Sequence, residues 1–466
     1  MLDTRFLPHN SHLDRPAQFE QLDPDLRRLR RQPLIHRFPL IDALPHDRPG
    51  IYSITGGRQI GKTTLLKQWM AQLLRRGVAP DRICYLTGEL IDDHHSLVRI
   101  LTDIIDGWGP DRAGYALLDE VTYVRDWDKG VKFLADAGVF ERVVLMLTGS
   151  DTTILREARA RFPGRRGTSA VVDFQAAPLT FHEYVRLHGS LSPAAASALA
   201  DPSAPVAPKV RALLDAELER YLRHGGYLRA INDLEREGTI APSTFATYAD
   251  WIRGDVLKRG KHEHYLREIL AAIVRRCGSQ VTWNGLAKDL SIDHPMTVAD
   301  YTALLASMDA VFVQPALRED KLSAAPKKAR RIMFSDPFIF HAVENWLRPD
   351  PDAFTNRVTP LLADPERAGR LAEACAVTHV RRFFPTFYIK AEGEVDIAYV
   401  HRGKFVPIEV KWTEQLRPRD LAQIAKYGNA RIWAKTWSPN AVHGIPVEPL
   451  PLALYRLGPS PLAAPY

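Results

Sequence analysis

The chain has 466 residues, a mass of 52.5 kDa, a formal net charge of +7 and a pI near 9.2. No apolar run approaches the roughly 18 residues that a membrane span requires, and the start has no apolar stretch typical of a signal peptide. We therefore expect a cytoplasmic protein of roughly two to four domains, without a membrane segment. The basic charge favours an anionic partner, with nucleic acid first. The three cysteines, Cys84, Cys277 and Cys375, predict neither a disulfide framework nor a metal knuckle.

The first half of the chain predicts a parallel α/β sheet after a basic extension. Residues 1–48 are rich in Arg and Pro and predict an extended or helical lead-in. From 49 to 188, short apolar runs (IYSI, ICYL, YALL and VVLML) alternate with helical stretches, which is typical of a parallel sheet. Residues 189–260 predict a connector and a helical region, of which 189–208, rich in Ser, Ala and Pro, is expected to be a mobile surface loop.

The second half predicts two further domains. Residues 261–345 contain three helical stretches followed by the strand-like runs VFVQPAL and RRIMF, an order typical of a winged helix. Residues 346–466 predict a small α/β domain with a helix at 366–380, three strands, a helix at 417–427 and a strand at 430–437. The predicted fold class is therefore a multidomain α/β protein with a helical, winged-helix middle.

The stretch TGGRQIGKTT, from Thr55 to Thr64, has the GxxxxGK[ST] spacing of a P-loop between a predicted strand and a predicted helix. Backbone N–H groups of such a loop surround the phosphates of ATP, and the helix N-terminus adds a positive dipole. Lys62 is predicted to reach the β- and γ-phosphates, and the Thr63 hydroxyl to bind Mg²⁺. The predicted ATP-binding residues are Gly56, Gly57, Arg58, Gln59, Ile60, Gly61, Lys62, Thr63 and Thr64.

Polar side chains follow the next two buried strands. In YALLDE, Asp119 is predicted to hold the Mg²⁺ shell and Glu120 to polarise the attacking water as the catalytic base. In VVLMLTGS, Thr148 and Ser150 could sense the γ-phosphate or the water. The alternative for this second strand is a simple strand-to-loop turn.

Together with PLTFHEY (178–184) and GGYLRAI (225–231), these motifs resemble the archaeal-type AAA-fold ATPases. The resemblance covers nearly the whole chain. It implies a parallel-sheet ATPase that hydrolyses Mg-ATP, followed by a winged helix and a restriction-endonuclease-like C-terminal domain. Leu228 departs from the family, which commonly has a proline at this position.

The resemblance also implies an arginine that stabilises charge on the transferred phosphate. Arg165 and Arg166 in FPGRRG are the candidates, and Arg229 is a candidate second sensor within the same chain. An arginine acting in trans would require a homo-oligomer, which the sequence leaves open. Equally, the arginines between 156 and 166 could be a solvated patch or could bind DNA phosphates.

Basic residues gather in the predicted wing, where they could neutralise nucleic-acid phosphates: Lys321, Lys327, Lys328, Arg330 and Arg331. The predicted recognition helix is not basic, which argues against sequence-specific base recognition. The alternative is a domain that packs against its neighbours or binds a protein.

The stretch EVDIAYVHRGKFVPIEVK (394–411) predicts two antiparallel strands in which Asp396, Glu409 and Lys411 converge on one face. Two carboxylates can hold a divalent ion, Mg²⁺ or Mn²⁺, while a lysine lowers the pKa of an attacking water. The hairpin resembles the PD-(D/E)XK nuclease core, which implies a further acid on a helix, for which Glu373 is the candidate. The alternative is a pair of amphipathic strands with solvated charges.

The sequence therefore predicts an ATPase that acts on DNA in repair, branched-DNA processing or defence, with a C-terminal domain that cuts or binds DNA. A second hypothesis is an ATP-dependent regulatory switch that binds a protein partner through an inert nuclease-like domain. A third is a defence nuclease for which ATP is only a gate.

Overall fold

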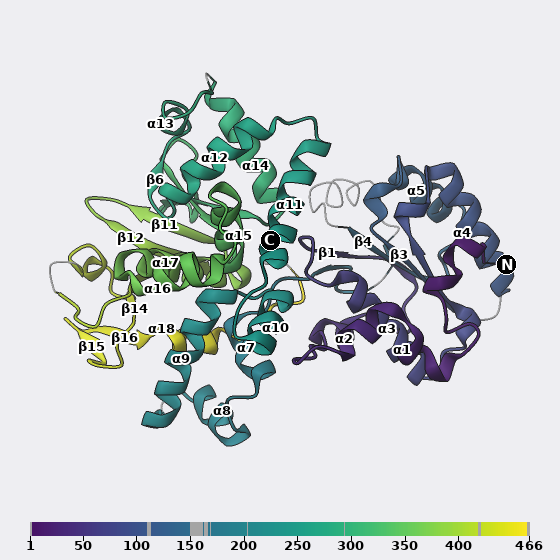
Figure 1. Ribbon diagram of the computed structural model, residues 1–466, viewed down its shortest axis with the longest axis horizontal. Coiled ribbons are helices and arrows are strands. Elements are labelled where there is room, and N and C mark those ends of the chain that lie inside the picture. The colour runs from purple at the N-terminus through teal and green to yellow at the C-terminus, as the bar shows by residue number, and fades with distance from the viewer. Residues whose placement is uncertain are drawn as a thin grey trace. The chain divides into compact units, whose positions relative to one another are not determined.

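Figure 1 shows the computed structural model of the chain. It describes residues 2–109, 113–149, 162, 166–167, 169–202, 204–292, 294–417 and 421–463. The chain forms two compact units: the first extends to Ala177 and includes Leu462, and the second extends from Pro178 to Pro461. Within the described residues, no helix combines the length and the apolar character needed to cross a membrane.

The first unit is built on a parallel five-stranded sheet with the strand order β2-β3-β4-β1-β5 (Figure 1). Its strands are β1 (Gly50–Thr55), β2 (Ile83–Thr87), β3 (Gly114–Asp119), β4 (Val143–Gly149) and β5 (Asp173–Gln175). The four apolar runs singled out in the sequence all form strands, so the predicted parallel α/β fold is confirmed. The strands β1, β3 and β4 are buried along their whole length, as expected for a parallel sheet covered on both faces.

Helices cover both faces of this sheet. They are α3 (Lys62–Arg75), α4 (His94–Trp108) and α5 (Trp127–Asp136). On one face, Ala116 and Leu118 of β3 belong to a core shared with α4 and α5. On the other face, Tyr115 of β3 meets Trp69 of α3 edge to face, with ring centroids 6.0 Å apart. Successive side chains of this strand thus pack against helices on opposite faces of the sheet.

The N-terminal segment packs onto the first unit as short helices: η1 (Thr4–His9), η2 (Pro16–Gln18), α1 (Phe19–Leu22), α2 (Pro24–Arg30) and η3 (Pro39–Ala43). Asn10 exchanges two hydrogen bonds of 2.8 Å with the backbone of Tyr85. The His12 Nε2 lies 2.9 Å from the Ile83 carbonyl oxygen. Because β2 is an edge strand, these side chains satisfy backbone groups that the edge would otherwise expose. The predicted lead-in is therefore part of the first compact unit.

The second unit combines helices with two main sheets. A three-stranded antiparallel sheet has the order β6-β10-β7, with β6 (Gln280–Val281), β7 (Val311–Pro315) and β10 (Arg330–Phe334). A six-stranded mixed sheet has the order β11-β12-β13-β14-β16-β15. Its strands are β11 (Thr386–Lys390), β12 (Glu394–His401), β13 (Lys404–Lys411), β14 (Arg431–Ala434), β15 (Ala441–Val442) and β16 (Ile445–Pro449). A short pair, β8 (Leu317–Arg318) and β9 (Ser323–Ala324), is antiparallel.

The helices of this unit lie before, between and after the sheets in the sequence. They are α7 (Phe181–His188), α8 (Pro193–Ala200), α9 (Pro208–His224), α10 (Leu228–Glu237), α11 (Pro242–Lys258), α12 (Glu263–Arg275), α13 (Trp283–Ala287), α14 (Pro295–Ser307), α15 (Pro337–Leu347), α16 (Thr359–Ala363), α17 (Pro365–Phe383) and α18 (Leu450–Leu457). Within the stretch 261–345, the described residues form α12, α13 and α14, with β6 between α12 and α13, and then β7 to β10 and the first part of α15. The winged helix stays a prediction.

Two sequence-based expectations were wrong in this unit. The predicted loop 189–208 contains α8, because Ser192 caps the helix by accepting from the Ala195 N–H and Pro193 occupies its first position. The predicted helix 417–427 is absent from the described part of that stretch, where only a 3-10 turn (Ile424–Lys426) forms. Leu421 and Ile424 are buried in the core of the mixed sheet, and this tertiary anchoring overrides helix propensity.

The two motifs at 178–184 and 225–231 pack directly against each other. The Leu179 N–H donates to the Gly226 carbonyl at 2.8 Å, and a Cβ on Gly226 would lie 2.2 Å from the Leu179 carbonyl oxygen. Only glycine allows this backbone approach. Leu228 is the first residue of α10, a position that also suits proline, so the departure from the family does not disturb the helix start.

We expect Asn10→Ala to loosen the edge of the sheet, because it leaves the buried N–H and C=O of Tyr85 without their side-chain partner. The local cost should be about 1–3 kcal/mol. Hydrogen exchange measured by mass spectrometry should show faster exchange in residues 83–87. Gln21→Ala, an exposed change in α1, is the control; equal protection in both variants would contradict the edge-capping role.

Candidate functional site

The phosphate loop connects the end of β1 to the start of α3. Gly61 precedes the helix with a φ of 99°, and Gln59 has a φ of 60°. The Lys62 Nζ donates to the carbonyl oxygens of Gly56 at 3.1 Å and Gly57 at 3.0 Å. The loop therefore curls around the ammonium group at the N-terminus of α3, the arrangement that suits a phosphate.

Packing around the loop explains two of its residue types. A Cβ on Gly56 would lie 2.3 Å from the carbonyl oxygen of Ala176, so this backbone approach requires glycine. Ile60 is buried, which anchors the tip of the loop. Arg58 donates to the Tyr123 hydroxyl at 3.0 Å. The loop is thus held by packing on both sides.

Asp119 is the carboxylate to which the neighbouring hydroxyl groups converge. Its Oδ2 accepts from Thr63 Oγ1 at 2.7 Å and from the Tyr85 hydroxyl at 2.6 Å. Its Oδ1 accepts from Thr148 Oγ1. Burial raises the pKa of Tyr85 well above its usual value, so this hydroxyl remains a neutral donor. Thr64 lies in the same first turn of α3 as Thr63.

Glu120 follows β3 in a left-handed conformation with a φ of 50°. Its backbone N–H donates to Thr148 Oγ1 at 3.0 Å, and its Oε1 lies 3.4 Å from Lys62 Nζ. The structure therefore brings together the predicted lysine, threonine, aspartate and glutamate, and places the candidate sensor Thr148 where it bonds both acids.

Sequence reasoning missed a second layer behind this site. The buried Lys67 of α3 lies 3.2 Å from the Asp23 carboxylate and 3.6 Å from the ring centroid of Tyr85. It also donates to the His9 carbonyl at 2.5 Å. Because Tyr85 donates to Asp119, the N-terminal segment is connected to the site through one tyrosine. The available sequence signal was a lysine on the apolar face of the predicted helix.

Of the predicted arginines at 165 and 166, the described Arg166 lies away from the phosphate loop. Arg166 pairs with Asp173 of β5 at 2.7 Å, and its carbonyl lies against Gly50, the first residue of β1, whereas the phosphate loop follows the last residue of that strand. This position does not support a role for Arg166 at phosphates bound by the same chain. Arg165 and Ser150 lie outside the described residues.

The remaining basic candidates belong to the second unit. Arg229 donates to Thr247 Oγ1 at 3.1 Å, and its sensor role stays a prediction. In the predicted wing, the Arg330 guanidinium stacks 4.3 Å from the Trp283 ring, and Lys328 donates to the Lys390 carbonyl. These two side chains therefore already have contacts within the chain.

The hairpin of β12 and β13 brings its charged residues to one place. Asp396 Oδ2 accepts from the Val410 N–H at 2.9 Å, and Lys411 Nζ donates to Glu409 Oε1 at 2.6 Å. Glu373 of α17 lies close to these acids, and burial, followed by repulsion from Asp396, raises the pKa of Glu373 to about 8. We refer to Glu373, Asp396 and Glu409 as the carboxylate cluster. The sequence-based convergence of these acids with Lys411 matches this geometry.

The sequence did not indicate that Arg331 enters this cluster. Its Nη1 donates to Glu373 Oε1 at 2.8 Å, and its guanidinium lies 3.3 Å from carboxylate oxygens of Asp396 and Glu394. Arg331 was expected in an exposed wing, but it is buried at the end of β10 that pairs with β6. The arginine thus supplies an internal cation where the nuclease resemblance implies a divalent ion.

Burial is the main reason why the pKa values of Glu373 and Glu409 are raised. Burial and, next, repulsion from Asp396 raise the pKa of Glu409 to about 8. The Glu409 Oε2 is buried and has no hydrogen-bond partner among the described residues. Among those residues, no group of three or more His, Cys, Asp or Glu side chains has an arrangement that could hold a metal ion. As arranged around Arg331, the cluster does not fit a divalent ion.

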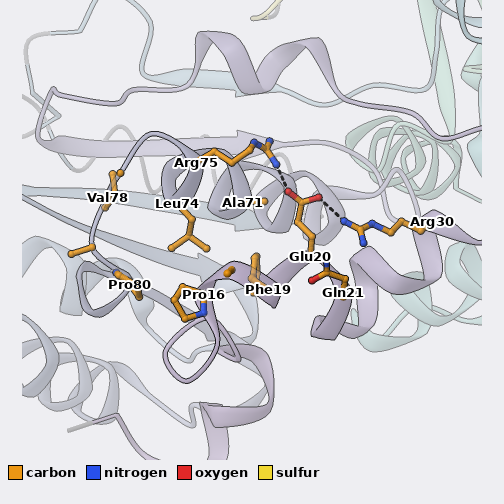
Figure 2. A pocket seen from close by; sticks show the side chains of 13 residues that line it. Pro16, Phe19, Glu20, Gln21, Arg30, Ala71, Leu74, Arg75, Val78 and Pro80 are labelled. Carbon is orange, nitrogen blue, oxygen red and sulfur yellow. Dashed lines mark hydrogen bonds and ion pairs between the residues drawn. The ribbon is translucent and has the colours of Figure 1, made fainter.

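The first unit also contains a pocket of about 590 Å³ away from the phosphate loop (Figure 2). Figure 2 shows Glu20 reaching both Arg30 and Arg75 at its rim. Arg75 ends α3, whereas Lys62 begins it, so the pocket lies about 20 Å along the helix from the ammonium group. It is therefore separate from the site described above.

We expect Glu409→Gln to stabilise the second unit at high pH. A carboxyl whose folded pKa is raised loses stability as pH rises from its unfolded value near 4.5 to about 8, because the folded state must then bury a charge. Glutamine removes this cost, which should be on the order of 2 kcal/mol at pH 9 and small at pH 5.

Urea unfolding at the two pH values measures this difference. Glu414→Gln, at an exposed position of the same segment, is the control and should show no pH-dependent gain. An equal or lower stability of Glu409→Gln at pH 9 would show that the buried charge is fully compensated in the unchanged protein.

Comparisons with known proteins agree with the geometry of the first unit. Residues 48–185 match the family described as AAA domain, and residues 215–350 match a domain of unknown function (DUF8612). An uncharacterized protein of Haemophilus influenzae is 22% identical over 259 residues, which cover 54% of this chain and 58% of that protein. The chain thus spans less than two thirds of the length of this relative.

Solved structures resemble the chain at low identity. The Walker-type ATPase PABY2304 of Pyrococcus abyssi is 14% identical with a TM-score of 0.39, covering 63% of this chain and 91% of that one. The ORC1 protein of Aeropyrum pernix, solved in complex with DNA, is 15% identical with a TM-score of 0.31, covering 74% and 94%. These scores are too low to carry an argument about function. The parallel sheet, the phosphate loop and the family match together show that residues 48–185 form a P-loop ATPase domain of the AAA type.

Proposed function

We propose that the first unit binds Mg-ATP at the phosphate loop and hydrolyses it by attack of water on the γ-phosphate. The observation that carries this proposal is the convergence of Lys62, Thr63, Asp119 and Glu120, in which Thr63 donates to Asp119 and Lys62 forms an ion pair with Glu120. These are the groups that phosphoryl transfer to water requires.

Each residue has a role that follows from its present contacts. Lys62 now donates to two loop carbonyls, and phosphate oxygens entering the loop would take over as its acceptors. Glu120, beside Lys62 and held by Thr148, would orient the water and accept its proton. The Thr148 hydroxyl fixes the position of Glu120 relative to Asp119, because it accepts from the Glu120 N–H and donates to the Asp119 carboxylate.

The donor set also fits magnesium. Thr63 Oγ1 and the Asp119 carboxylate are oxygen donors 2.7 Å apart, and oxygen donors are the ones that Mg²⁺ prefers. These two residues would hold the ion, which supplies neutralisation of charge that develops on the phosphate oxygens. An arginine from a neighbouring subunit, Arg165 or Arg166, and Arg229 as a sensor remain proposals that an oligomer would test.

We further propose that the ATPase acts on DNA through the second unit. The net charge of +7 and the resemblance of the carboxylate cluster, with Lys411, to a nuclease core support this role. The cluster would then serve as part of a DNA-binding surface, and it could cut DNA only if Arg331 left it. A specific observation favours the alternative, a switch with an inert nuclease-like domain: Arg331 already compensates the carboxylates that would hold Mg²⁺ or Mn²⁺.

We expect Lys62→Ala to lose ATP binding and hydrolysis, because no other side chain within the described loop places a cation between the Gly56 and Gly57 carbonyls. Glu120→Gln should retain ATP binding but lower kcat by about 100- to 10,000-fold. Phosphate release and fluorescent-nucleotide binding measure the two effects separately. Lys132→Ala and Glu141→Gln, both exposed in the same unit, are the controls. A Glu120→Gln enzyme with unchanged kcat would exclude Glu120 as the base.

We expect forked or duplex DNA to raise the ATPase rate several-fold. We also expect the unchanged protein to leave labelled DNA intact in Mg²⁺ and Mn²⁺, because Arg331 occupies the cluster. Arg331→Met removes this internal cation; Arg330→Met, at the neighbouring stacked residue, is the control. Cleavage by the unchanged protein that Asp396→Ala abolishes would show a working nuclease. An ATPase rate that no DNA changes would favour the switch that binds a protein.

A further inference from the structure

The second unit contains a pocket of about 360 Å³ whose rim is formed by arginines. They come from α12, the residue after α15, the helical turn before α16, and α17: Arg275, Arg348, Arg357, Arg367 and Arg370. None of them is part of the phosphate loop or of the carboxylate cluster. Five guanidinium groups around one small pocket repel each other, and a bound anion would offset this repulsion.

Carboxylates within the chain compensate only part of this charge. Glu344 is the acid that lines the pocket, and it pairs with Arg367 at 2.7 Å. Arg370 pairs with Glu366, whose side chain is 75% exposed, and exposed pairs of this kind are weak. Neither of these ion pairs involves Arg275, Arg348 or Arg357.

The other three arginines have little or no compensation. The buried Nε of Arg357 has no hydrogen-bond partner among the described residues, and it lies 4.0 Å from the Asp350 carboxylate. In the same part of the chain, Arg275 and Arg348 form no ion pair with a described residue and are exposed. The pocket therefore presents free guanidinium groups, which bind phosphate oxygens well because their donors match them in pairs.

The base of the pocket is apolar. Cys277, Phe340, Leu361 and Leu371 line it and are buried. Burial raises the pKa of the Cys277 thiol to about 12, so this side chain adds no charge. A cationic rim over an apolar base fits a ligand that joins a phosphate to a flat, weakly polar body, as a nucleotide does.

The surroundings extend this site in two directions. A second pocket of about 300 Å³ shares Arg275, Arg348 and Glu344, and adds Arg267, whose guanidinium stacks 4.8 Å from the Trp346 ring. On α17, the residue Glu373 of the carboxylate cluster follows Arg370 by three positions, about one helical turn. The arginine pocket therefore adjoins a second pocket, and one of its arginines lies about one helical turn from the cluster.

We propose that this pocket binds the phosphate group of a nucleotide, either a free mononucleotide or the terminal phosphate of a nucleic-acid strand. Arg275, Arg348 and Arg357 hold the phosphate, and the apolar base receives the adjoining sugar or base. The inference goes beyond the proposed ATP hydrolysis and does not require the carboxylate cluster to cut DNA.

Binding to the full chain carrying Lys62→Ala, which removes the phosphate loop as a competing site, tests the proposal. The probes are fluorescent single-stranded oligonucleotides with a 5′-phosphate, with a 3′-phosphate or with neither, followed by anisotropy. In this background, Arg275→Ala/Arg348→Ala should weaken the binding of a phosphorylated end by about tenfold or more and should leave the unphosphorylated oligonucleotide unchanged.

The matched control is Lys209→Ala/Arg236→Ala, which removes two exposed charges of the same unit outside the pocket. Displacement of the phosphorylated oligonucleotide by AMP would show that a free nucleotide suffices, and its failure would assign the site to strand ends. Equal affinity for all three oligonucleotides together with no competition by AMP, or equal losses in both double variants, would overturn the proposal. ATP hydrolysis by Arg275→Ala/Arg348→Ala with Lys62 intact reports on the proposed ATPase separately.

Discussion

The buried carboxylate of Asp119 holds together the elements that form the site in the first unit. It accepts hydrogen bonds from Thr63 on α3, Tyr85 on β2 and Thr148 on β4. A buried carboxylate that lost these donors would be costly, so the three elements cannot shift independently of it. Through Tyr85 and Lys67 the same network reaches the N-terminal segment, which also caps the edge of β2. The geometry of the phosphate site and the packing of the first 48 residues therefore depend on one set of contacts.

The same constraint on buried charge has a different outcome in the second unit. Three acids converge there: Arg331 of the neighbouring antiparallel sheet pairs with Glu373 and Asp396, and Lys411 pairs with Glu409. A pattern of acids with a lysine is compatible with a metal site, but it does not exclude an internal ion pair at the same place. Neighbouring residues of the predicted wing accordingly differ in their contacts: Arg331 is buried in the cluster, whereas Arg330 stacks on Trp283. The resemblance to a nuclease core therefore does not by itself establish that this arrangement can bind a metal ion.

Two of the motifs that resemble the AAA-fold family pack closely against each other. The backbones of 178–184 and 225–231 meet so closely that Gly226 cannot carry a side chain. Gly225 has a φ of 59°, and a Cβ there would collide with the carboxylate of Asp336, which also accepts from the Gly226 N–H at 2.8 Å. A distinctive sequence motif can therefore mark a close backbone crossing at the start of a compact unit.

The sequence by itself determined the parallel sheet, the phosphate loop and the hairpin with Asp396, Glu409 and Lys411, because local periodicity and fixed spacing specify strands, loops and the faces of strands. It did not reveal α8 or the absence of a helix at 417–427, since capping by Ser192 and anchoring of Leu421 compete with composition and propensity. Only the tertiary structure decided which cation the carboxylates meet, that Tyr85 joins Asp119, and that five arginines gather around one pocket. These contacts join residues far apart in the chain. A buried charge is costly unless it is paired, and a local sequence pattern does not specify which side chains are buried together.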